Sequence, residues 1–269
     1  GCHFKQKRTY GSTRIIEYIQ EIQTDLAEKI WKKMQKAIKK GAEFIILPEF
    51  CVSEEIRKYI SERLLSYKLN ESEKSKLIAV FPGSTWIETN DNVQFIMDAW
   101  GREKGQYYKN TPFRKRKKDE SGYQFCEGLT HPGYRTSLLR IEGLGYILPA
   151  TCRDVIDGPY TCYYVSRFHP AFLFVPAWST SGQAFVQPLK RYAMDYYTNS
   201  VLCNGCGALK KKTSIAGGAV IPAKDKTVAS GHFKEIKMTQ TQSEGCAKEC
   251  DKLCSYMLKI DFAGSDTVR

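Results

Sequence analysis

The chain has 269 residues, of which 42% are hydrophobic, and it carries a formal net charge of +12. This length and apolar content are enough for one large α/β domain or two smaller domains with a sizeable core. No run of about 18 uncharged apolar residues occurs, which excludes an ordinary membrane-spanning helix. The positive charge is explained either by solubility or by a polyanionic partner, and both explanations stay open.

The ten cysteines raise the question of disulfides. The N-terminus opens with GCHFKQKR, which is polar and basic and does not resemble a secretory signal. In a chain of this length without such a signal, we expect thiols rather than a disulfide framework, and a cytoplasmic location.

The first elements are expected to be two helices around a short strand. Apolar residues recur every three or four positions from Ser12 to Lys40, which predicts an amphipathic helix with Gly41 as its C-terminal cap. The β-prone run Phe44 to Leu47 predicts a strand buried on both faces. Ser53 to Leu69 predicts a second helix, with Ser53 as its N-cap.

The rest of the chain is mostly β-prone. A hairpin is expected from Leu138 to Pro149, turning at Glu142-Gly143, and a helix from Gln187 to Asn199. Other apolar runs predict strands at 76–83, 93–99, around 107–108, and at 171–178, 200–203, 217–223 and 256–262. Helices that alternate with β-rich runs favour an α/β fold, and the absence of a repeat or linker favours one domain over residues 1–269.

Three apolar runs each lead to one reactive side chain. FIILPEF contains Glu49, QYYKNTPF contains Lys109 and GYILPATCRDV contains Cys152. A cysteine enzyme that cleaves a carbon–nitrogen bond needs a thiolate nucleophile, a base that activates it, and a cation or amide donor that meets the developing negative charge. All three residues follow predicted strands, where α/β folds tend to hold their active sites.

Each of these residues also has an ordinary structural explanation. A cysteine after a strand is often an inert core residue. Glu49 could stabilise the positive end of the following helix, and Lys109 could lie at a sheet edge. The hypothesis of a catalytic site therefore depends on the three residues occurring together, in this order.

Their order and context resemble the nitrilase (carbon–nitrogen hydrolase) superfamily. FIILPEF resembles its strand that ends in Pro-Glu, which puts the general base at Glu49. NVQFIMDAWGREKGQYYKNTPF resembles its segment ending in Tyr-x-Lys, which puts the catalytic lysine at Lys109. CEGLTHPG carries over a second glutamate at Glu127, and LGYILPATCRDV resembles the nucleophile elbow, with Cys152 as the nucleophile. Similar segments continue as far as Phe262.

The resemblance implies a four-layer α-β-β-α sandwich of the nitrilase type. It also implies that no metal or organic cofactor is needed, and that the protein self-associates through the helices flanking the elbow. In the implied mechanism Glu49 takes the proton of Cys152, which forms a thioester or thioimidate. Lys109 stabilises the oxyanion, and Glu127 orients Lys109 or the substrate.

Two residues next to the nucleophile complete the expected site, and the N-terminus departs from the pattern. The backbone N–H of Arg153 is expected to share the oxyanion with the lysine, and Asp154 to anchor the elbow. Arg153 stands where an aromatic residue is common in the superfamily, and it could attract an anionic substrate. The family's apolar first strand is not visible in GCHFKQKRTYGS, which is too polar for a central strand.

Cysteine pairs leave a metal site as an alternative. Cys203 and Cys206 form a Cys-x-x-Cys pair, and Cys246, Cys250 and Cys254 recur every four residues. Zinc sites often combine two such clusters. The second group is spaced more widely than a usual zinc knuckle, and Cys203 falls in a predicted core strand, so we expect no metal.

Basic runs leave a nucleic-acid partner open. FRKRKKDE, residues 113–120, contains five consecutive basic residues that suit phosphate contacts or a solvated loop. Lys210 to Lys212 form a second run. The four histidines are scattered and receive no catalytic role.

These observations predict an enzyme that hydrolyses a non-peptide carbon–nitrogen bond in a small molecule. An amide is favoured over a nitrile, because nitrile hydrolysis is the rarer activity in the superfamily. The alternative is a nitrilase-like accessory domain cut from a larger, nucleic-acid-handling protein, since such domains occur fused to other enzymes.

Overall fold

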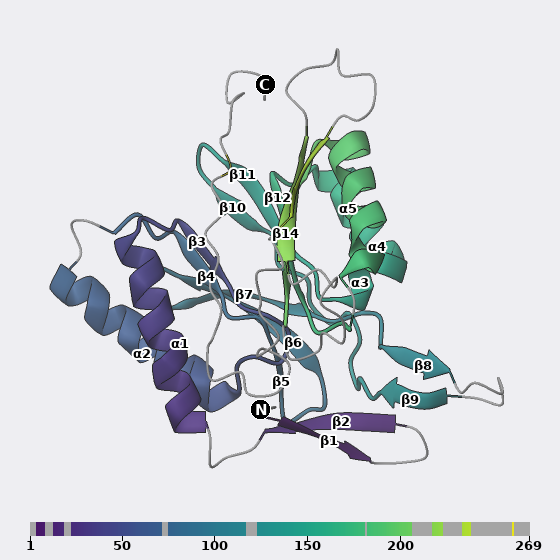
Figure 1. Cartoon of the computed structure of the whole chain (residues 1–269), viewed down its shortest axis with the longest axis horizontal. Helices are drawn as coiled ribbons and strands as arrows, with labels where there is room; N and C mark the ends of the chain where they lie inside the picture. Colours follow the sequence, from purple (N-terminus) through teal and green to yellow (C-terminus); the bar gives the residue numbers. More distant parts are fainter. Residues whose placement is uncertain are drawn as a thin grey trace. The chain divides into compact units, whose positions relative to one another are not determined.

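The structure is a computed structural model that describes residues 4–8, 13–18, 23–71, 75–116, 123–180, 182–205, 217–222, 233–237 and 260 (Figure 1). The described chain is a mixed α/β fold, as the sequence predicts. It divides into two compact units, one ending at Thr136 and the other beginning at Ser137. The prediction of a single domain over residues 1–269 stays a prediction.

The first unit contains two helices and two sheets. One sheet has the order β3-β4-β6-β5 with β7 beside β6, and the other has the order β1-β2-β9-β8. The elements are α1 (Gln23–Lys39), α2 (Glu54–Glu71), β1 (Phe4–Arg8), β2 (Thr13–Tyr18), β3 (Phe44–Ile46), β4 (Ala79–Phe81), β5 (Ser84–Trp86), β6 (Asn92–Asp98), β7 (Glu103–Tyr108), β8 (Arg114–Arg116) and β9 (Tyr123–Glu127).

The N-terminal region differs from the prediction. The helix begins at Gln23 rather than Ser12, and Thr13–Tyr18 forms strand β2, which pairs with β1 and runs parallel to β9. The segment TRIIEY forms a strand because it is rich in β-branched and aromatic residues. The spacing of its apolar residues, from which we predicted a helix, was therefore not decisive. Strand β1 lies in the polar segment in which no apolar first strand was visible, and it is at the end of the sheet order rather than at its centre.

The two helices cover one face of the β3-β4-β6 sheet and lie side by side (Figure 1). The predicted caps are confirmed: Gly41 has φ +83° and its N–H donates to Ile38 O, and the Ile56 N–H donates to Ser53 Oγ at 3.3 Å. The core of this layer consists of Ala27, Ile30, Trp31, Met34, Ile38, Ile45, Val52, Ile56, Ile60, Leu64, Leu77, Val80 and Met97.

Strand β6 gives the sheet two chemically different faces. Met97 belongs to the helix-side core, and the Arg57 guanidinium of α2 lies over the Phe95 ring. Because side chains alternate along a strand, Asn92 and Gln94 point to the opposite face. Both are fully buried, so the face away from the helices is buried but polar.

The second unit is one sheet with the order β10-β11-β12-β13-β14-β15, flanked by three helices. The expected hairpin is confirmed, turning at Gly143 with φ +74°, and β12 is buried along its whole length. The elements are β10 (Leu139–Ile141), β11 (Gly145–Pro149), α3 (Arg153–Asp157), α4 (Pro159–Phe168), β12 (Phe172–Ala177), α5 (Gln183–Tyr196), β13 (Asn199–Asn204), β14 (Gly217–Pro222) and β15 (Phe233–Lys237).

Some elements of the second unit were not predicted. Helices α3 and α4 and strand β15 have no counterpart in the sequence-based assignment, and α5 begins four residues before the expected Gln187. The strand expected at 256–262 lies outside the described residues except for Ile260. Each unit contains helices and a sheet, and the four-layer sandwich itself stays a prediction. No helix in the described ranges is long and apolar enough to cross a membrane.

Candidate active site

Glu49 lies in a tight turn after β3. The Leu47 N–H donates to Phe81 O at 2.8 Å, and the Phe50 N–H donates to Ser84 O at 2.8 Å, so the turn is tied to the neighbouring chain on both sides of the glutamate. Phe50 has φ 58°, a left-handed conformation that non-glycine residues adopt only when their surroundings enforce it. The Glu49 side chain is 1% exposed. The backbone therefore fixes a buried carboxylate at this point.

Gly83 makes this turn possible, and its replacement should reveal how tightly the turn is packed. Gly83 has φ +75°, and a Cβ on it would collide with the carbonyl of Pro48, the residue before Glu49. We expect Gly83→Ala to lower the free energy of unfolding by about 3 kcal/mol, from the left-handed backbone and the collision together. Urea denaturation at pH 7 measures the loss.

Gly143 provides the matched control for this substitution. It has nearly the same φ, +74°, but no atom lies within 4 Å of where its Cβ would be. Gly143→Ala should therefore cost only the backbone term, about 1–2 kcal/mol. Equal losses in the two variants would contradict the close approach of Gly83 to Pro48.

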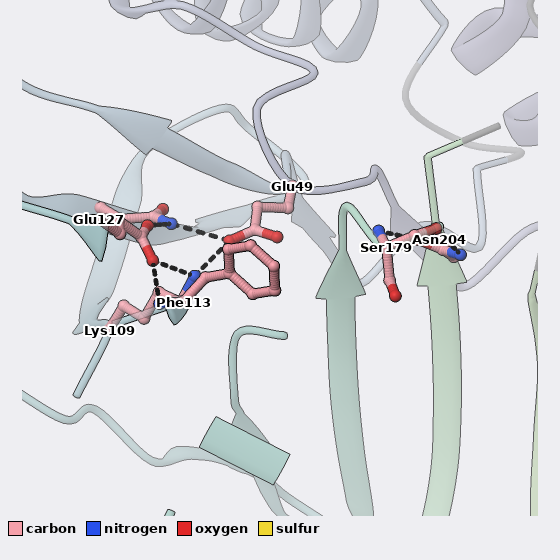
Figure 2. Close-up of polar contacts among 7 residues, drawn as sticks. Glu49, Lys109, Phe113, Glu127, Ser179 and Asn204 are labelled. Atoms are coloured by element: carbon pink, nitrogen blue, oxygen red, sulfur yellow. Dashed lines mark hydrogen bonds and ion pairs between the residues drawn. The ribbon is translucent and has the colours of Figure 1, made fainter. Parts of the chain in front are cut away.

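Lys109 follows β7, and backbone hydrogen bonds on both sides fix its position. Its N–H donates to Asn92 O at 2.9 Å, and its carbonyl accepts the Gly133 N–H at 3.2 Å. The side chain is 1% exposed, and its Nζ lies 2.8 Å from Glu49 Oε1 and 2.7 Å from Glu127 Oε2. Lys109 therefore joins the two predicted glutamates through one ammonium group (Figure 2).

Glu127 ends β9 and has two further donors. The Phe113 N–H donates to Glu127 Oε2 at 2.9 Å, and Asn92 Nδ2 donates to Glu127 Oε1 at 3.0 Å. The same Asn92 Nδ2 donates to Glu49 Oε1 at 2.9 Å. Two carboxylates, one ammonium and one amide thus form a closed ring of hydrogen bonds, which we call the carboxylate ring (Glu49, Asn92, Lys109 and Glu127).

The charge of the carboxylate ring is unusual for a protein interior. With both glutamates ionised and the lysine protonated, the ring carries a net charge of −1 while its members are at most 5% exposed. Burial of charge is costly unless each group is paired and hydrogen-bonded. Here every carboxylate oxygen that faces the ring accepts a hydrogen bond, which offsets part of that cost.

Another buried carboxylate, Asp91, attaches the 128–136 loop beside the ring. The His131 N–H donates to Asp91 Oδ1 at 2.6 Å, His131 Nδ1 lies 2.8 Å from Asp91 Oδ2, and the Thr89 hydroxyl donates to Asp91 Oδ2 at 2.9 Å. Burial alone would raise the pKa of Asp91, but the hydrogen bonds from His131 and Thr89 outweigh it, and the pKa lies below its ordinary value of 3.8. The loop that follows Glu127 is thereby fixed to the start of β6.

The lowered pKa of Asp91 predicts a pH-dependent stability. A carboxyl whose pKa falls on folding stabilises the protein above its unfolded value, and this contribution disappears as pH falls through the folded value. We expect Asp91→Asn to cost about 1–2 kcal/mol at pH 7, with the loss shrinking below pH 3.8. Urea denaturation at several pH values measures this. The exposed Asp195, replaced by asparagine, serves as control; a pH-independent loss in Asp91→Asn would contradict the assignment.

Cys152 lies at a sharp turn in the second unit, between β11 and α3. The Ala150 N–H donates to Phe174 O and the Cys152 N–H donates to Pro176 O, at 3.0 and 2.9 Å, so pairing with β12 continues up to the cysteine. Cys152 has φ 48° and ψ −109°, and α3 starts at the next residue. A reactive residue on a strained strand-to-helix turn is the geometry of a nucleophile elbow.

The neighbours of Cys152 differ in exposure. Asp154 is fully buried, and its N–H donates to Thr151 O at 3.1 Å. The Arg153 side chain is 37% exposed and forms an ion pair with Asp157, one helical turn along α3. This pairing neutralises part of the charge that the sequence suggested for attracting an anionic substrate.

The ends of β12 and β13 are joined by a side-chain contact that the sequence did not suggest. Asn204 Oδ1 accepts the Ser179 N–H at 2.8 Å, and Asn204 Nδ2 donates to Ser179 O at 3.0 Å (Figure 2). Asn204 is 4% exposed and ends the strand beside β12. Asn204 therefore fixes the backbone of Ser179, which lies two residues after the end of β12.

The predicted site residues thus fall into two groups, each within one unit. Glu49, Lys109 and Glu127 come together in the first unit, while Cys152 and its neighbours Arg153 and Asp154 form the turn in the second. Sequence reasoning missed Asn92, although it formed part of the segment that resembles the superfamily. The available signal was an amide at the start of an otherwise apolar strand.

The alternative metal site receives no support from the described residues. Cys203 lies in β13, while Cys206, Cys246, Cys250 and Cys254 lie outside the described residues. Among the residues that the structure describes, no group of three or more metal-ligating side chains occurs, and none of the five cysteines there forms a disulfide. Residues 117–120 of the basic run and all of Lys210 to Lys212 also lie outside the described residues, whereas Arg114–Arg116 form β8.

Comparison with known proteins gives structural matches only. Neither a protein-family model nor a curated protein sequence matches the chain. A double mutant of the amidase from Nesterenkonia sp. AN1, in complex with acrylamide, is similar with a TM-score of 0.54 at 15% identity, covering 74% of this chain and 76% of that one. A single mutant of this amidase, with a glutamate replaced by glutamine, shows the result of Michael addition of acrylamide at the active-site cysteine, with a TM-score of 0.50 at 16% identity over 76% and 78% of the two chains.

A yeast protein gives a similar match. Saccharomyces cerevisiae Nit3, a member of branch 10 of the nitrilase superfamily, has a TM-score of 0.53 at 16% identity, covering 80% of this chain and 84% of that one. At such low identity the likeness concerns the fold. The chain has the fold of nitrilase-superfamily amidases, a group of carbon–nitrogen hydrolases.

Proposed function

We propose that the protein hydrolyses a non-peptide carbon–nitrogen bond, an amide rather than a nitrile, through a thioester on Cys152. The observation that supports this most is the carboxylate ring, in which Lys109 Nζ lies 2.8 Å from Glu49 Oε1 although both groups are buried. A structural ion pair could be replaced by apolar residues at little cost, whereas a buried base beside a cation suits catalysis. The strained turn at Cys152 adds a candidate nucleophile.

The first half of the reaction forms the thioester. Glu49 takes the proton of the Cys152 thiol, and the thiolate attacks the carbonyl carbon of the amide. Asn92 and Lys109 both contact Oε1 of Glu49, so we assign the proton transfer to Oε2. The tetrahedral oxyanion accepts hydrogen bonds from Lys109 Nζ and from the backbone N–H of Arg153.

The second half releases the acid. The oxyanion collapses, Glu49 returns the proton to the leaving nitrogen, and the amine or ammonia departs. Glu49 then takes a proton from water, whose oxygen attacks the thioester carbon and yields the carboxylic acid with the Cys152 thiol restored. Glu127 holds Lys109 in place throughout, and Asp154 supports the elbow. None of these steps calls for a metal or an organic cofactor.

Acrylamide offers a direct test, because it carries both an amide and an electrophilic carbon. In a Glu-to-Gln mutant of the amidase from Nesterenkonia sp. AN1, the active-site cysteine has added acrylamide. We expect this chain to gain the mass of one acrylamide at Cys152, and to release ammonia from members of a panel of aliphatic amides. Intact-mass spectrometry and an ammonia assay measure the two reactions.

Two cysteine variants make the test specific. Cys152→Ala should lose both the adduct and the ammonia release, whereas Cys162→Ala removes another described thiol, in α4, and should retain both. Ammonia release by Cys152→Ala at the parent rate would remove the assigned nucleophile.

The expected partners remain predictions alongside this function. Self-association through the helices flanking the elbow, a cytoplasmic location, and contact of the basic surface with nucleic acid or a larger parent polypeptide all derive from the sequence. The role of an accessory domain predicts retention on a polyanion column that added salt abolishes, without ammonia release.

A further inference from the structure

Asn92 occupies the centre of the carboxylate ring, and its backbone is fixed from both sides. It begins β6, pairs with Trp86 of β5, and its carbonyl accepts the Lys109 N–H at 2.9 Å. The residue is fully buried. The position of its side chain therefore depends on the same strand contacts that hold the lysine.

The chemistry of the two glutamates determines which way the amide points. Asn92 Nδ2 lies 2.9 Å from Glu49 Oε1 and 3.0 Å from Glu127 Oε1. Ionised carboxylates only accept hydrogen bonds, so the two N–H groups of the amide must face them, one to each. The oxygen, Oδ1, must then point the other way.

This orientation leaves a buried acceptor unused. Asn92 Oδ1 has no hydrogen-bond partner among the described residues, and a buried polar atom without a partner lowers stability. An apolar side chain of similar volume would avoid that loss. The amide is therefore explained by the two hydrogen bonds that it donates to the glutamates and not by its oxygen.

The proposed reaction needs the Glu49 carboxylate in its charged form, although a second carboxylate belongs to the same ring. Both glutamates share one ammonium, and two close carboxylates with too little positive charge tend to bind a proton between them. Hydrogen bonds donated to the charged form oppose that proton. If Glu49 were to bind it, the base that activates the nucleophile would be lost.

We infer that Asn92 is a positioning residue that holds Glu49 and Glu127 apart and keeps the base Glu49 in its charged form, and so sets the lower pH limit of the reaction. The inference deepens the proposed function and rests on it for its catalytic part. Asn92 itself contacts no reacting atom and acts through the two glutamates and Lys109.

The pH dependence of turnover tests the catalytic part. We expect Asn92→Ala to lower kcat by about 10-fold to 100-fold at the pH optimum, with little change in KM. The pH at which kcat/KM falls on the acidic side should rise by about one unit. Asn92→Ser keeps one hydroxyl donor and should give an intermediate shift. Asn199→Ala, which removes one amide hydrogen bond to Ala171 O at 2.9 Å in the second unit, should leave the profile unchanged.

A second readout does not depend on activity. Because the amide donates to Glu49 Oε1 and so favours the charged form of that carboxyl, its contribution to stability should be present at neutral pH and should diminish at acidic pH. The difference in Tm between the parent and Asn92→Ala should therefore shrink with falling pH. The difference for Asn199→Ala should stay constant.

The two readouts separate the possible failures. A Tm difference that does not depend on pH, together with an unshifted acidic limb, would overturn the role of Asn92. A parent protein that releases no ammonia and forms no adduct, but whose Tm difference shrinks with pH, would refute the proposed function and leave the electrostatic role of Asn92 intact.

Discussion

Replacing Lys109 with methionine is expected to abolish turnover and to lower the free energy of unfolding by about 3–5 kcal/mol at pH 7. The substitution removes the ammonium that lies 2.8 Å from Glu49 and 2.7 Å from Glu127, so that the two buried carboxylates lose their shared cation and keep neutral donors, among them the Asn92 amide and the Phe113 N–H. It also removes a donor to the oxyanion, which costs about 100-fold to 1,000-fold in kcat by itself. Urea denaturation and the ammonia assay measure the two losses.

The exposed ion pair of Lys58 with Glu54 provides the control. Its Nζ–Oε1 distance is 3.3 Å, and the Lys58 side chain is 66% exposed. Lys58→Met should change the free energy of unfolding by less than about 0.5 kcal/mol and leave turnover intact. A Lys109→Met variant as stable as the parent would show that the ring does not depend on its cation.

Replacing Glu49 with glutamine should give the same catalytic loss without the loss of stability. The glutamine side chain is nearly isosteric and brings the net charge of the ring from −1 to zero, so the remaining Lys109–Glu127 pair, at 2.7 Å, is balanced. We expect a change in the free energy of unfolding within about 1 kcal/mol, but a fall in kcat/KM of about 100-fold to 10,000-fold, because the base is gone.

The two variants together distinguish charge balance from simple packing. If Glu49→Gln loses as much stability as Lys109→Met, the loss follows from disturbed packing rather than from uncompensated charge. If Glu49→Gln retains the parent's turnover, Glu49 is not the base. A useful companion is Glu127→Gln, which also brings the ring to zero charge but leaves the base in place.

The sequence predicted the catalytic candidates better than their surroundings. Glu49 stands out because it follows the short apolar strand β3, and Lys109 because it follows the two tyrosines that end β7, and local sequence reveals both patterns. Glu127 was assigned from the family resemblance alone, and Asn92 received no role. The contribution of Asn92 depends on strand pairing that brings it to Glu49 and Glu127, which are 43 and 35 positions away in the sequence. The periodicity of a single segment does not reveal such long-range pairing.

The elements that were missed have related causes. The helix predicted from Ser12 failed in its first part because pairing with β9, more than 100 residues later, decides the conformation of β2. Helix α3 has only five residues and follows directly from the turn at Cys152, so it offers too little sequence for a helical period. Strand β5 has three residues and lies between Gly83 and the 87–91 turn.

The proposed reaction requires the Cys152 thiol to reach both Glu49 and Lys109. A crystal structure of the acrylamide adduct, or of the free protein, would give the distances from Cys152 Sγ to Glu49 Oε2 and to Lys109 Nζ. We predict both distances to be about 3–4 Å in a shared pocket, within reach of direct proton transfer. Distances beyond about 8 Å in the free protein and the adduct alike would contradict catalysis by this trio.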